Sequence, residues 1–405
     1  MRSNQALLFI LLTIAIDSIG IGIIFPVMPD LMQSVTGEDL AHAALWGGVL
    51  STAFAVMQFL CGPIVGNLSD RFGRRPVMLI ALATMAVDYV VMALAQSVWI
   101  LLVTRIIAGI TAATYATAAA YIADVSPAEQ RARNFGFIGA AFGIGFVLGP
   151  MIGGLASVLG TRAPFWIAAG IAAANFIYGA LVLPESLKPE KRRALSWARA
   201  NPLASFRAIG HLPGLRRYLF VMFLYTTCFT SYPAIWSYYG KAAFGWDGWW
   251  NGISLAVFGL FMGLAQGLGT GPAVKYFGER LTAIYGSILH AITFVFYGFI
   301  RSGAVAIAFS PVAAAGDVAG PAMQGTMSNL TPDDQQGELQ GVLSAVNSVA
   351  ASISPLVMTY IFYRFTEPGA AIYAPGAPFL LAAALMVVCV LVLVATPSEK
   401  PAAAI

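Results

Sequence analysis

Twelve apolar runs, each about the length that crosses a lipid bilayer as one helix, constrain this chain more than any other feature. A run of roughly 18–25 residues with few charges is typical of a transmembrane helix. Since the chain is 59% hydrophobic and only 10% charged, a soluble domain could not bury its apolar surface, and the predicted fold class is all-α and integral to a membrane. No cleavable signal is expected, because residues 1–5 lead directly into a full-length run. The runs lie at 7–27, 44–65, 77–95, 98–122, 134–158, 163–183, 217–238, 249–270, 281–300, 303–329, 338–363 and 375–396.

A polar stretch at 184–216 divides these runs six and six. We therefore expect an N-terminal six-helix bundle at 1–183, a cytoplasmic linker at 184–216 with a surface helix around 195–209, and a C-terminal six-helix bundle at 217–405. A short repeat supports this division. The segment 271–281 follows the segment 66–76 by 205 residues and keeps two glycines, a phenylalanine and an arginine in register. A duplicated six-helix unit predicts such a repeat, and hence two pseudo-symmetric bundles.

Lysine and arginine positions predict the orientation in the membrane. With the amino terminus inside the cell, 17 of the 22 basic residues fall on the cytoplasmic side, four fall outside, and Arg105 lies within the membrane. Cytoplasmic loops carry an excess of lysine and arginine. Both termini are therefore expected to be cytoplasmic.

The segment 66–76 is a short, densely charged turn between two apolar runs. It begins with Gly66 and contains Asp70 with Arg71, followed by Arg74 and Arg75. A turn this short makes the flanking helices antiparallel neighbours. The glycine between these two charged pairs, at position 73, is expected to supply the backbone freedom that a tight reversal needs.

Five ionisable residues stand out well inside apolar runs, where a charge at the helix centre costs about 2.5–3.5 kcal/mol. They are Asp17, Asp88, Arg105, His290 and Asp317. Asp17 lies in a predominantly apolar run and precedes two glycines and two prolines, as expected where a helix lines a cavity. We interpret Asp17 as a protonatable or cation-binding carboxylate, and the alternative is a structural cap or bridge between helices.

The other four residues also have a functional and a structural interpretation. Asp88 either contacts substrate or is a hydrogen-bonded strut. Arg105 keeps its proton and must face a carboxylate, carbonyl groups or water, with Asp17 as the first partner to test. Asp317, in a glycine-broken segment, and His290, which can titrate near neutral pH, either take part in proton transfer or only bridge helices.

Glycines repeat along the fifth run and flatten one face of the expected helix. Spacing of four residues lets another backbone approach closely, and a proline bends the helix, so packing is the simplest interpretation. The series consists of Gly136, Gly145, Gly149, Pro150, Gly153 and Gly154.

Other residues in the runs have simpler interpretations. Gln58 and Gln324 are the best candidates to line a cavity, although a single intramembrane amide more often forms an interhelical hydrogen bond. The three cysteines are interpreted as core residues. The three histidines are scattered without metal-ligand spacing, so we expect neither metal nor cofactor. Seven aromatic residues are interpreted as an interfacial belt: Tyr232, Trp236, Tyr238, Tyr239, Trp246, Trp249 and Trp250.

Together these residues resemble the drug/proton antiporters of the major facilitator superfamily, most closely the tetracycline efflux family. The resemblance covers nearly the whole chain, and it implies the major facilitator fold. It is carried by Asp17 with Gly20, Gly22, Pro26 and Pro29, by Met57-Gln58, by the segment 69–77, by Asp88-Tyr89, by Arg105 with 109–111, by the glycine–proline series 136–154, and by the segments 321–325 and 336–341.

The resemblance implies roles for these residues. Asp70 and the residues around it, from Gly66 to Arg75, would form a gating latch on the cytoplasmic side. Asp17 and Arg105 would belong to the proton or substrate pathway, with Asp88 and Gln58 lining the cavity. The glycine–proline series is associated with antiporters. In contrast, two positions depart from the family, since His290 occupies the place of an acidic residue in helix 9 and Met262 that of a frequent histidine in helix 8.

The sequence therefore predicts a proton-coupled efflux antiporter in a bacterial inner membrane, working as a monomer on a small amphipathic molecule such as tetracycline or another drug. Proton coupling is assigned to Asp17, Arg105, His290 and Asp317. A permease that imports a small metabolite is the first alternative. A membrane-embedded enzyme is a remote one, and nucleic acid is not an expected partner.

Overall fold

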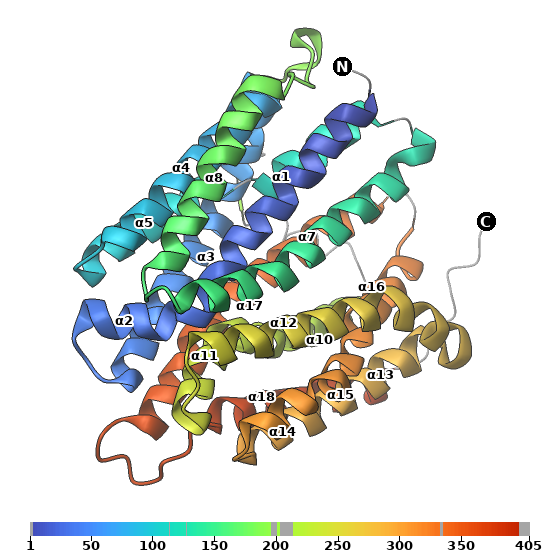
Figure 1. Cartoon of the computed structure of the whole chain (residues 1–405). Helices are drawn as coiled ribbons and strands as arrows, with labels where there is room; N and C mark the ends of the chain where they lie inside the picture. Colours follow the sequence, from blue (N-terminus) through green and yellow to red (C-terminus); the bar gives the residue numbers. More distant parts are fainter. Residues whose placement is uncertain are drawn as a thin grey trace. The chain divides into compact units, whose positions relative to one another are not determined.

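A computed structural model describes residues 3–112, 114–126, 128–195, 201–202, 214–332 and 335–396, and these residues form helices and turns with no strand (Figure 1). Most of the predicted surface helix at 195–209 lies outside the described residues. In the first half the helices are α1 (Ser3–Ile24), η1 (Phe25–Val27), α2 (Met28–Thr36), α3 (Leu40–Phe72), α4 (Arg74–Leu94), α5 (Val98–Thr111), α6 (Thr114–Val125), α7 (Ala128–Ser157), α8 (Ala163–Val182) and η2 (Pro189–Lys191). In the second half they are α10 (Arg216–Phe229), α11 (Ser231–Phe244), α12 (Gly248–Leu264), η4 (Ala265–Gly269), α13 (Thr270–Phe299), α14 (Gly303–Ala308), α15 (Ser310–Ala315), η5 (Gly316–Val318), α16 (Ala319–Asn329), α17 (Gln336–Thr366) and α18 (Ala377–Ala395).

The predicted membrane spans agree with these helices. Within the described residues, ten helical stretches are long and apolar enough to cross a membrane. One of them, Gly248–Phe299, covers two predicted spans and contains a sharp backbone break at Gly278, where φ is 76°. The predicted span at 98–122 is formed by the shorter helices α5 and α6. The structure is therefore consistent with twelve spans.

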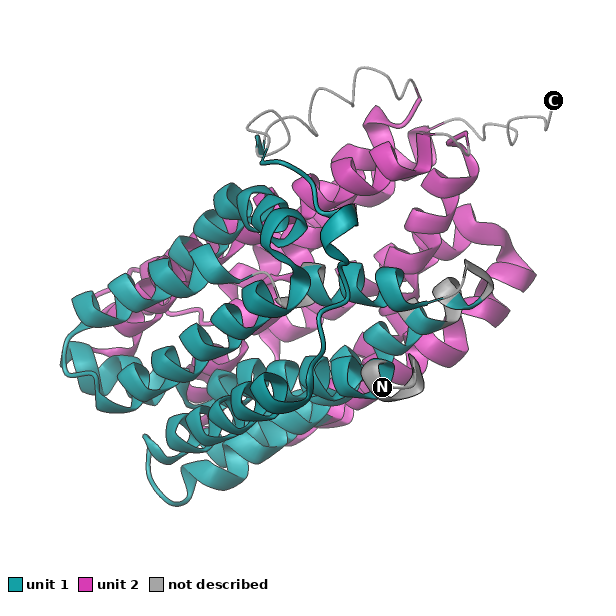
Figure 2. Cartoon of the chain, turned by 90° about the horizontal axis from the view of Figure 1, so that it is seen from above, with its two compact units in different colours: residues 1–38, 53–202, 247–256 teal, residues 39–52, 203–246, 257–405 magenta. Residues whose placement is uncertain are grey.

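The described helices group into two compact units (Figure 2). Unit 1 consists of Met1–Glu38, Ala53–Pro202 and Asp247–Ala256, and unit 2 of Asp39–Thr52, Leu203–Trp246 and Val257–Ile405. The first part of the predicted linker thus belongs to unit 1. The start of α3 belongs to unit 2, where Gly48 lies directly against Thr359 of α17.

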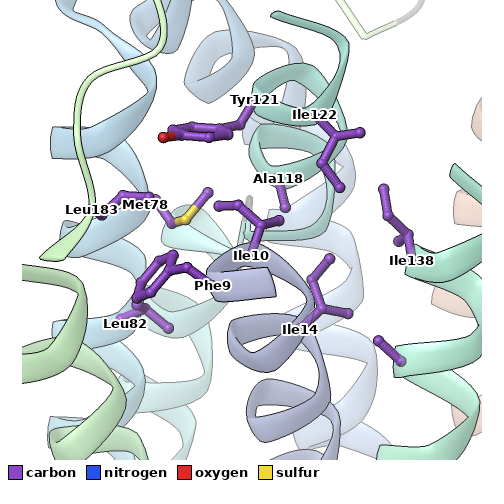
Figure 3. Packing of buried hydrophobic residues seen from close by; sticks show 11 residues of the cluster. Phe9, Ile10, Ile14, Met78, Leu82, Ala118, Tyr121, Ile122, Ile138 and Leu183 are labelled. Atoms are coloured by element: carbon purple, nitrogen blue, oxygen red, sulfur yellow. The ribbon is translucent and has the colours of Figure 1, made fainter. Parts of the chain in front are cut away.

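In unit 1, α1 packs along α7 and α4 packs along α8 (Figure 1). The side chains of Phe9, Ile10 and Ile14 on α1 form the centre of a buried cluster that α4, α6 and α7 complete (Figure 3). Its other members are Met78, Leu82, Ala118, Tyr121, Ile122, Ile138, Ala141 and Leu183.

The glycine series in α7 explains why α1 and α7 come so close. A Cβ atom on Gly145 would lie 2.5 Å from the Ala15 carbonyl oxygen, and one on Gly149 would lie 2.7 Å from Gly22 Cα. Gly153 meets the backbone of α1 in the same way one turn later. The predicted close approach is therefore present. Gly136, in contrast, has open space where its Cβ would be.

The predicted interfacial aromatic belt is wrong for most of its members. Tyr232, Trp236, Tyr238, Tyr239 and Trp246 are buried inside unit 2, whereas Trp250 is 48% exposed. Ring packing and hydrogen bonding hold this cluster together. The centroids of Trp236 and Tyr297 are 4.9 Å apart, and the Tyr239 hydroxyl donates to the Tyr297 carbonyl oxygen at 2.6 Å.

The α1–α7 contact predicts opposite effects for two Gly→Ala substitutions in one helix. Gly149→Ala should lower the free energy of unfolding by about 1–3 kcal/mol, because the new methyl group overlaps the α1 backbone. Gly136→Ala, the matched control, should leave stability unchanged or raise it, since alanine favours helix. Thermal unfolding of the purified protein in detergent measures both. Equal melting temperatures for the two variants would contradict the packing argument.

Candidate functional site

Asp17 lies inside α1, and other side chains pack closely against the same part of this helix. Its Oδ1 atom is buried and has no hydrogen-bond partner. A Cβ atom on Gly20 would lie 2.9 Å from the Tyr89 hydroxyl oxygen, so the Tyr89 ring sits against this face of α1. Asp17 and Tyr89 interact electrostatically. Asp17 is thus a carboxylate in a membrane-spanning helix with free hydrogen-bonding capacity.

Arg105 forms its ion pair with Asp88, which corrects the expectation that Asp17 is its partner. The guanidinium Nη2 on α5 contacts Asp88 Oδ2 on α4, and the side chains are 13% and 3% exposed. The guanidinium carbon also lies 5.6 Å from the centroid of the Phe54 ring, and Nη2 lies 3.4 Å from Met92 Sδ. Because α4 and α5 pack against each other, the helix packing holds Asp88 and Arg105 next to each other.

The buried Asp88–Arg105 pair predicts strong non-additivity in a double-mutant cycle. Either Asp88→Asn or Arg105→Gln alone should destabilise the protein by about 3–5 kcal/mol, because one buried charge then has no partner. The double variant should be more stable than the sum of the two single effects predicts. Thermal unfolding of the four proteins measures the coupling. Strictly additive losses would show that the two charges do not depend on each other.

In unit 2, His290 and Asp317 form a second buried pair. His290 Nε2 on α13 lies 3.2 Å from Asp317 Oδ1 on η5, and the side chains are 1% and 0% exposed. Sequence reasoning singled out both residues but did not place them together. The short 3₁₀ turn between α15 and α16 brings Asp317 to the face of α13.

The two predicted cavity amides have different surroundings. Gln58 on α3 donates from Nε2 to the Ala112 carbonyl oxygen at 3.2 Å, at the end of α5. Gln58 therefore forms an interhelical hydrogen bond, which was the simpler of the two interpretations of this residue. Gln324 on α16 is exposed in unit 2.

The charged turn is tighter than the sequence suggested, because α3 continues to Phe72 and α4 begins at Arg74. Gly73 alone forms the reversal, with φ 110°, as predicted. Arg74 Nη1 binds Asp70 Oδ1 at 2.7 Å and the Ser69 hydroxyl at 2.9 Å. Arg71 is exposed and stacks on the Phe72 ring, and Gly66 has open space around it.

Glu185, which sequence reasoning missed, is the residue that fixes this turn. Its carboxylate accepts hydrogen bonds from the backbone N–H groups of Arg74 at 2.8 Å and Arg75 at 3.2 Å. Those groups are the open N-terminus of α4, where a negative charge is favoured. The carboxylate also occupies the space where a Cβ on Gly73 would lie. No local motif reveals this contact, because it joins residues 111 positions apart.

Two further contacts connect the same turn to the rest of unit 1. Asp124 at the end of α6 accepts from Arg74 Nε at 3.3 Å and from the Ser186 hydroxyl at 3.0 Å. The Arg193 backbone N–H donates to the Asp70 carbonyl oxygen at 3.1 Å. The described start of the predicted linker is therefore bonded to the charged turn.

The repeat found in the sequence corresponds to repeated geometry. Gly278, 205 residues after Gly73, has φ 76° and ψ 163°, close to the φ 110° and ψ 162° of Gly73. Arg75 donates to the Ala180 carbonyl oxygen near the end of α8 at 2.7 Å, and its counterpart Arg280 donates to the Thr396 carbonyl oxygen after α18 at 2.5 Å. In each half, the same arginine thus binds the C-terminal end of the last helix, where a positive charge is favoured.

The contacts of Glu185 predict that it stabilises the turn. Glu185→Ala should lower the free energy of unfolding by about 0.5–2 kcal/mol, the range for loss of a helix N-cap. Glu190→Ala, five residues further along and exposed, is the control and should have no effect. Chemical denaturation of both variants measures the difference. A wild-type stability for Glu185→Ala would argue that the carboxylate contributes nothing there.

Comparison with known proteins agrees with this architecture. The family model described as Major Facilitator Superfamily matches residues 10–269 and 244–404. The chain belongs to the Major Facilitator Superfamily. It is 40% identical over 389 residues to the class C tetracycline resistance protein of Escherichia coli, covering 96% of each chain, and 38% identical over 368 residues to the class E protein of the same organism, covering 90% of this chain and 89% of that one.

A solved structure of the same superfamily has a similar fold. This major facilitator superimposes on the crystal structure of the human organic anion transporter MFSD10 with a TM-score of 0.70 and 26% sequence identity. The match covers 97% of this chain and 100% of that one. The protein is thus a membrane transporter of the superfamily, as its sequence resemblance implied.

Proposed function

We propose that this transporter is a proton-coupled efflux antiporter that exports small amphipathic molecules, tetracycline among them, by alternating access. The observation that carries the proposal is the Asp17 carboxylate, which has a buried oxygen without a hydrogen-bond partner in a membrane-spanning helix. A carboxylate so placed is costly when charged and binds a proton or a cation readily. Similarity to tetracycline resistance proteins over 96% of the chain supports the substrate class.

Proton coupling is assigned to Asp17 and Arg105 in unit 1 and to His290 and Asp317 in unit 2. Substrate binding is assigned to Asp17, Gln58 and Asp88 in unit 1 and to Gln324 in unit 2. Protonation removes the cost of a buried negative charge and favours one state, whereas substrate favours the other. A potential of 100 mV supplies about 2.3 kcal/mol per charge moved, and each tenfold gradient costs about 1.4 kcal/mol. One proton therefore supports export against a gradient of several tens-fold when net charge moves.

The charged turn is proposed as the gating latch of this cycle. Its residues are Gly66, Asp70, Arg71, Gly73, Arg74 and Arg75. Support comes from the bonds that hold it, because the Asp70–Arg74 pair and the Glu185 carboxylate fix one arrangement of the turn. The α7 series from Gly136 to Gly154 is proposed to make the chain an exporter, through its tight contact with the helix that carries Asp17.

We propose the bacterial cytoplasmic membrane as the site of action, with the protein working as a monomer and both termini in the cytoplasm. Support comes from the charge distribution, with 17 of 22 basic residues on the expected inner side. Resistance proteins of Escherichia coli among the relatives fit this location.

Proteoliposomes test the function and the role of Asp17 together. Tetracycline added to vesicles that contain the wild-type protein should release protons from the lumen as the drug is taken up. Asp17→Asn should abolish this exchange, because the neutral amide cannot bind the proton, while the protein still inserts into the membrane. A fluorescent pH indicator inside the vesicles records the release.

Glu38→Gln, which changes an exposed acidic residue between α2 and α3, is the control and should transport normally. Transport by Asp17→Asn at the wild-type rate would remove Asp17 from the mechanism. Uptake of tetracycline by the wild type without any proton movement would refute antiport.

A further inference from the structure

Three phenylalanine side chains of unit 1, Phe25, Phe142 and Phe146, form a row of ring contacts that we call the aromatic row. The Phe142 and Phe146 rings on α7 have centroids 6.2 Å apart and an angle of 18° between their planes. The Phe25 ring on η1, directly after α1, lies 6.1 Å from the Phe146 ring. Phe142 is 41% exposed, and the other two side chains are half-buried. All three side chains therefore keep accessible surface.

The aromatic row lies beside the part of α1 that carries Asp17. Phe142 and Phe146 are four residues apart, which places them on one face of α7. Gly145 lies between them in the sequence and meets α1 directly, since its Cβ would lie 2.5 Å from Ser18 Cβ. Ser18 follows Asp17 in the chain. The two rings of α7 therefore flank the level of the Asp17 carboxylate along the helix.

One face of α1 connects the carboxylate to the aromatic row. Asp17, Ile21 and Phe25 have the i, i+4, i+8 spacing of side chains that follow one face of a helix. Ile21 is 37% exposed, and the Phe25 ring contacts Phe146 across the packing of η1 against α7. This surface therefore has a carboxylate at one end, rings at the other end and an aliphatic side chain between them.

Lipid is not expected to cover this face of unit 1. A carboxylate in a membrane-spanning segment almost always faces the interior of the bundle or a water-filled space, because hydrocarbon cannot solvate its charge. The rings on the side that carries Asp17 share these surroundings. A further ring on α7, Phe137, is 43% exposed but lies nine residues before Phe146, which is two and a half turns and the opposite side of the helix. Phe137 thus has the same helix and similar exposure but another face.

The two ends of the surface suit one kind of molecule. Aromatic faces stack on flat ring systems in offset or edge-on geometry, and they also attract cations. The Asp17 carboxylate has a buried Oδ1 atom without a hydrogen-bond partner, and it can accept a charge-assisted hydrogen bond from a protonated amine. A ligand that uses both ends has a flat fused-ring body and a cationic amine.

We propose that Phe25, Phe142 and Phe146, with Asp17 and Ile21, form a substrate-binding surface for flat fused-ring molecules that carry a cationic amine. This inference rests on the proposed export of small amphipathic molecules and names their chemical class. The rings bind the flat body, and Asp17 binds the amine. Tetracycline belongs to this class, because it has a fused-ring body and a dimethylamino group.

Equilibrium binding to the full-length protein in detergent tests the role of the rings. Two fluorescent probes are used, tetracycline and ethidium, a flat aromatic cation of unrelated structure. Phe142→Leu and Phe146→Leu keep an apolar side chain but lose the ring, so each should bind both probes about 3- to 10-fold more weakly. Phe146→Tyr keeps the ring and should bind both probes as the wild type does. Phe137→Leu is the matched control on the opposite side of α7 and should change neither affinity.

A competitor without a flat ring separates substrate recognition from packing. Tetrabutylammonium is a cation that cannot stack, and it should displace ethidium by binding at Asp17. Its inhibition constant should be the same in the wild type and in Phe146→Leu, and displacement should be lost in Asp17→Asn. Looser packing of α1 on α7 would instead weaken the binding of all three compounds alike. Thermal unfolding checks that each variant is folded.

The outcomes distinguish this inference from the proposed function. Wild-type affinity for both fluorescent probes in the double variant with Phe142→Leu and Phe146→Leu overturns the substrate-binding surface, and tetracycline export by the wild type is unaffected by that result. An equal loss of tetrabutylammonium and ethidium binding in folded Phe146→Leu assigns the ring to packing and also overturns it. Ring-dependent ethidium binding by a wild-type protein that neither binds nor transports tetracycline supports the surface and refutes tetracycline export. A folded wild type that binds neither probe overturns both.

Discussion

A charge is tolerated inside hydrocarbon only where a partner of opposite sign, or a proton, is built next to it, and this constraint organises the structure. Each half of the chain places one acidic and one basic side chain on its third and fourth spans and buries them together. An arginine base makes its pair a permanent feature of the fold. Asp17 forms no ion pair of this kind in the described part of the chain, and its Oδ1 atom is buried without a hydrogen-bond partner.

Close backbone contact is the second requirement, and glycine provides it near Asp17 and near the His290–Asp317 pair. Gly145 and Gly149 bring α7 against α1 on either side of the turn that follows Asp17, and Gly286 and Gly316 bring α13 against the turn that carries Asp317. Polar groups gain most from a partner where water is excluded. The glycines therefore do more than permit packing, because they set the distance at which the buried acids meet their surroundings.

Much of this architecture could be predicted from the sequence, since membrane spans and turns have local signatures. The apolar runs, the positive φ at Gly73, the repeat around Gly278 and the glycine spacing of α7 follow from run length and residue type. The partner of Arg105 could not be predicted, because a run of apolar residues does not say which way a charged side chain points. Glu185 has no signature either, since its partner is the end of a helix 111 residues earlier. The aromatic residues at 232–246 were misassigned because composition cannot distinguish rings that face lipid from rings that face other rings.

The hydrogen bonds that join Glu185 and Arg193 to the charged turn determine where the first half of the chain ends as a structural unit. The last apolar helix of the first half ends at Val182, but the residues that bond to the charged turn continue to Arg193. The first half therefore extends about ten residues beyond its last helix. If the transporter is made as two polypeptides, the first must therefore include residues 183–193, because Glu185 and Arg193 hold the turn around Gly73.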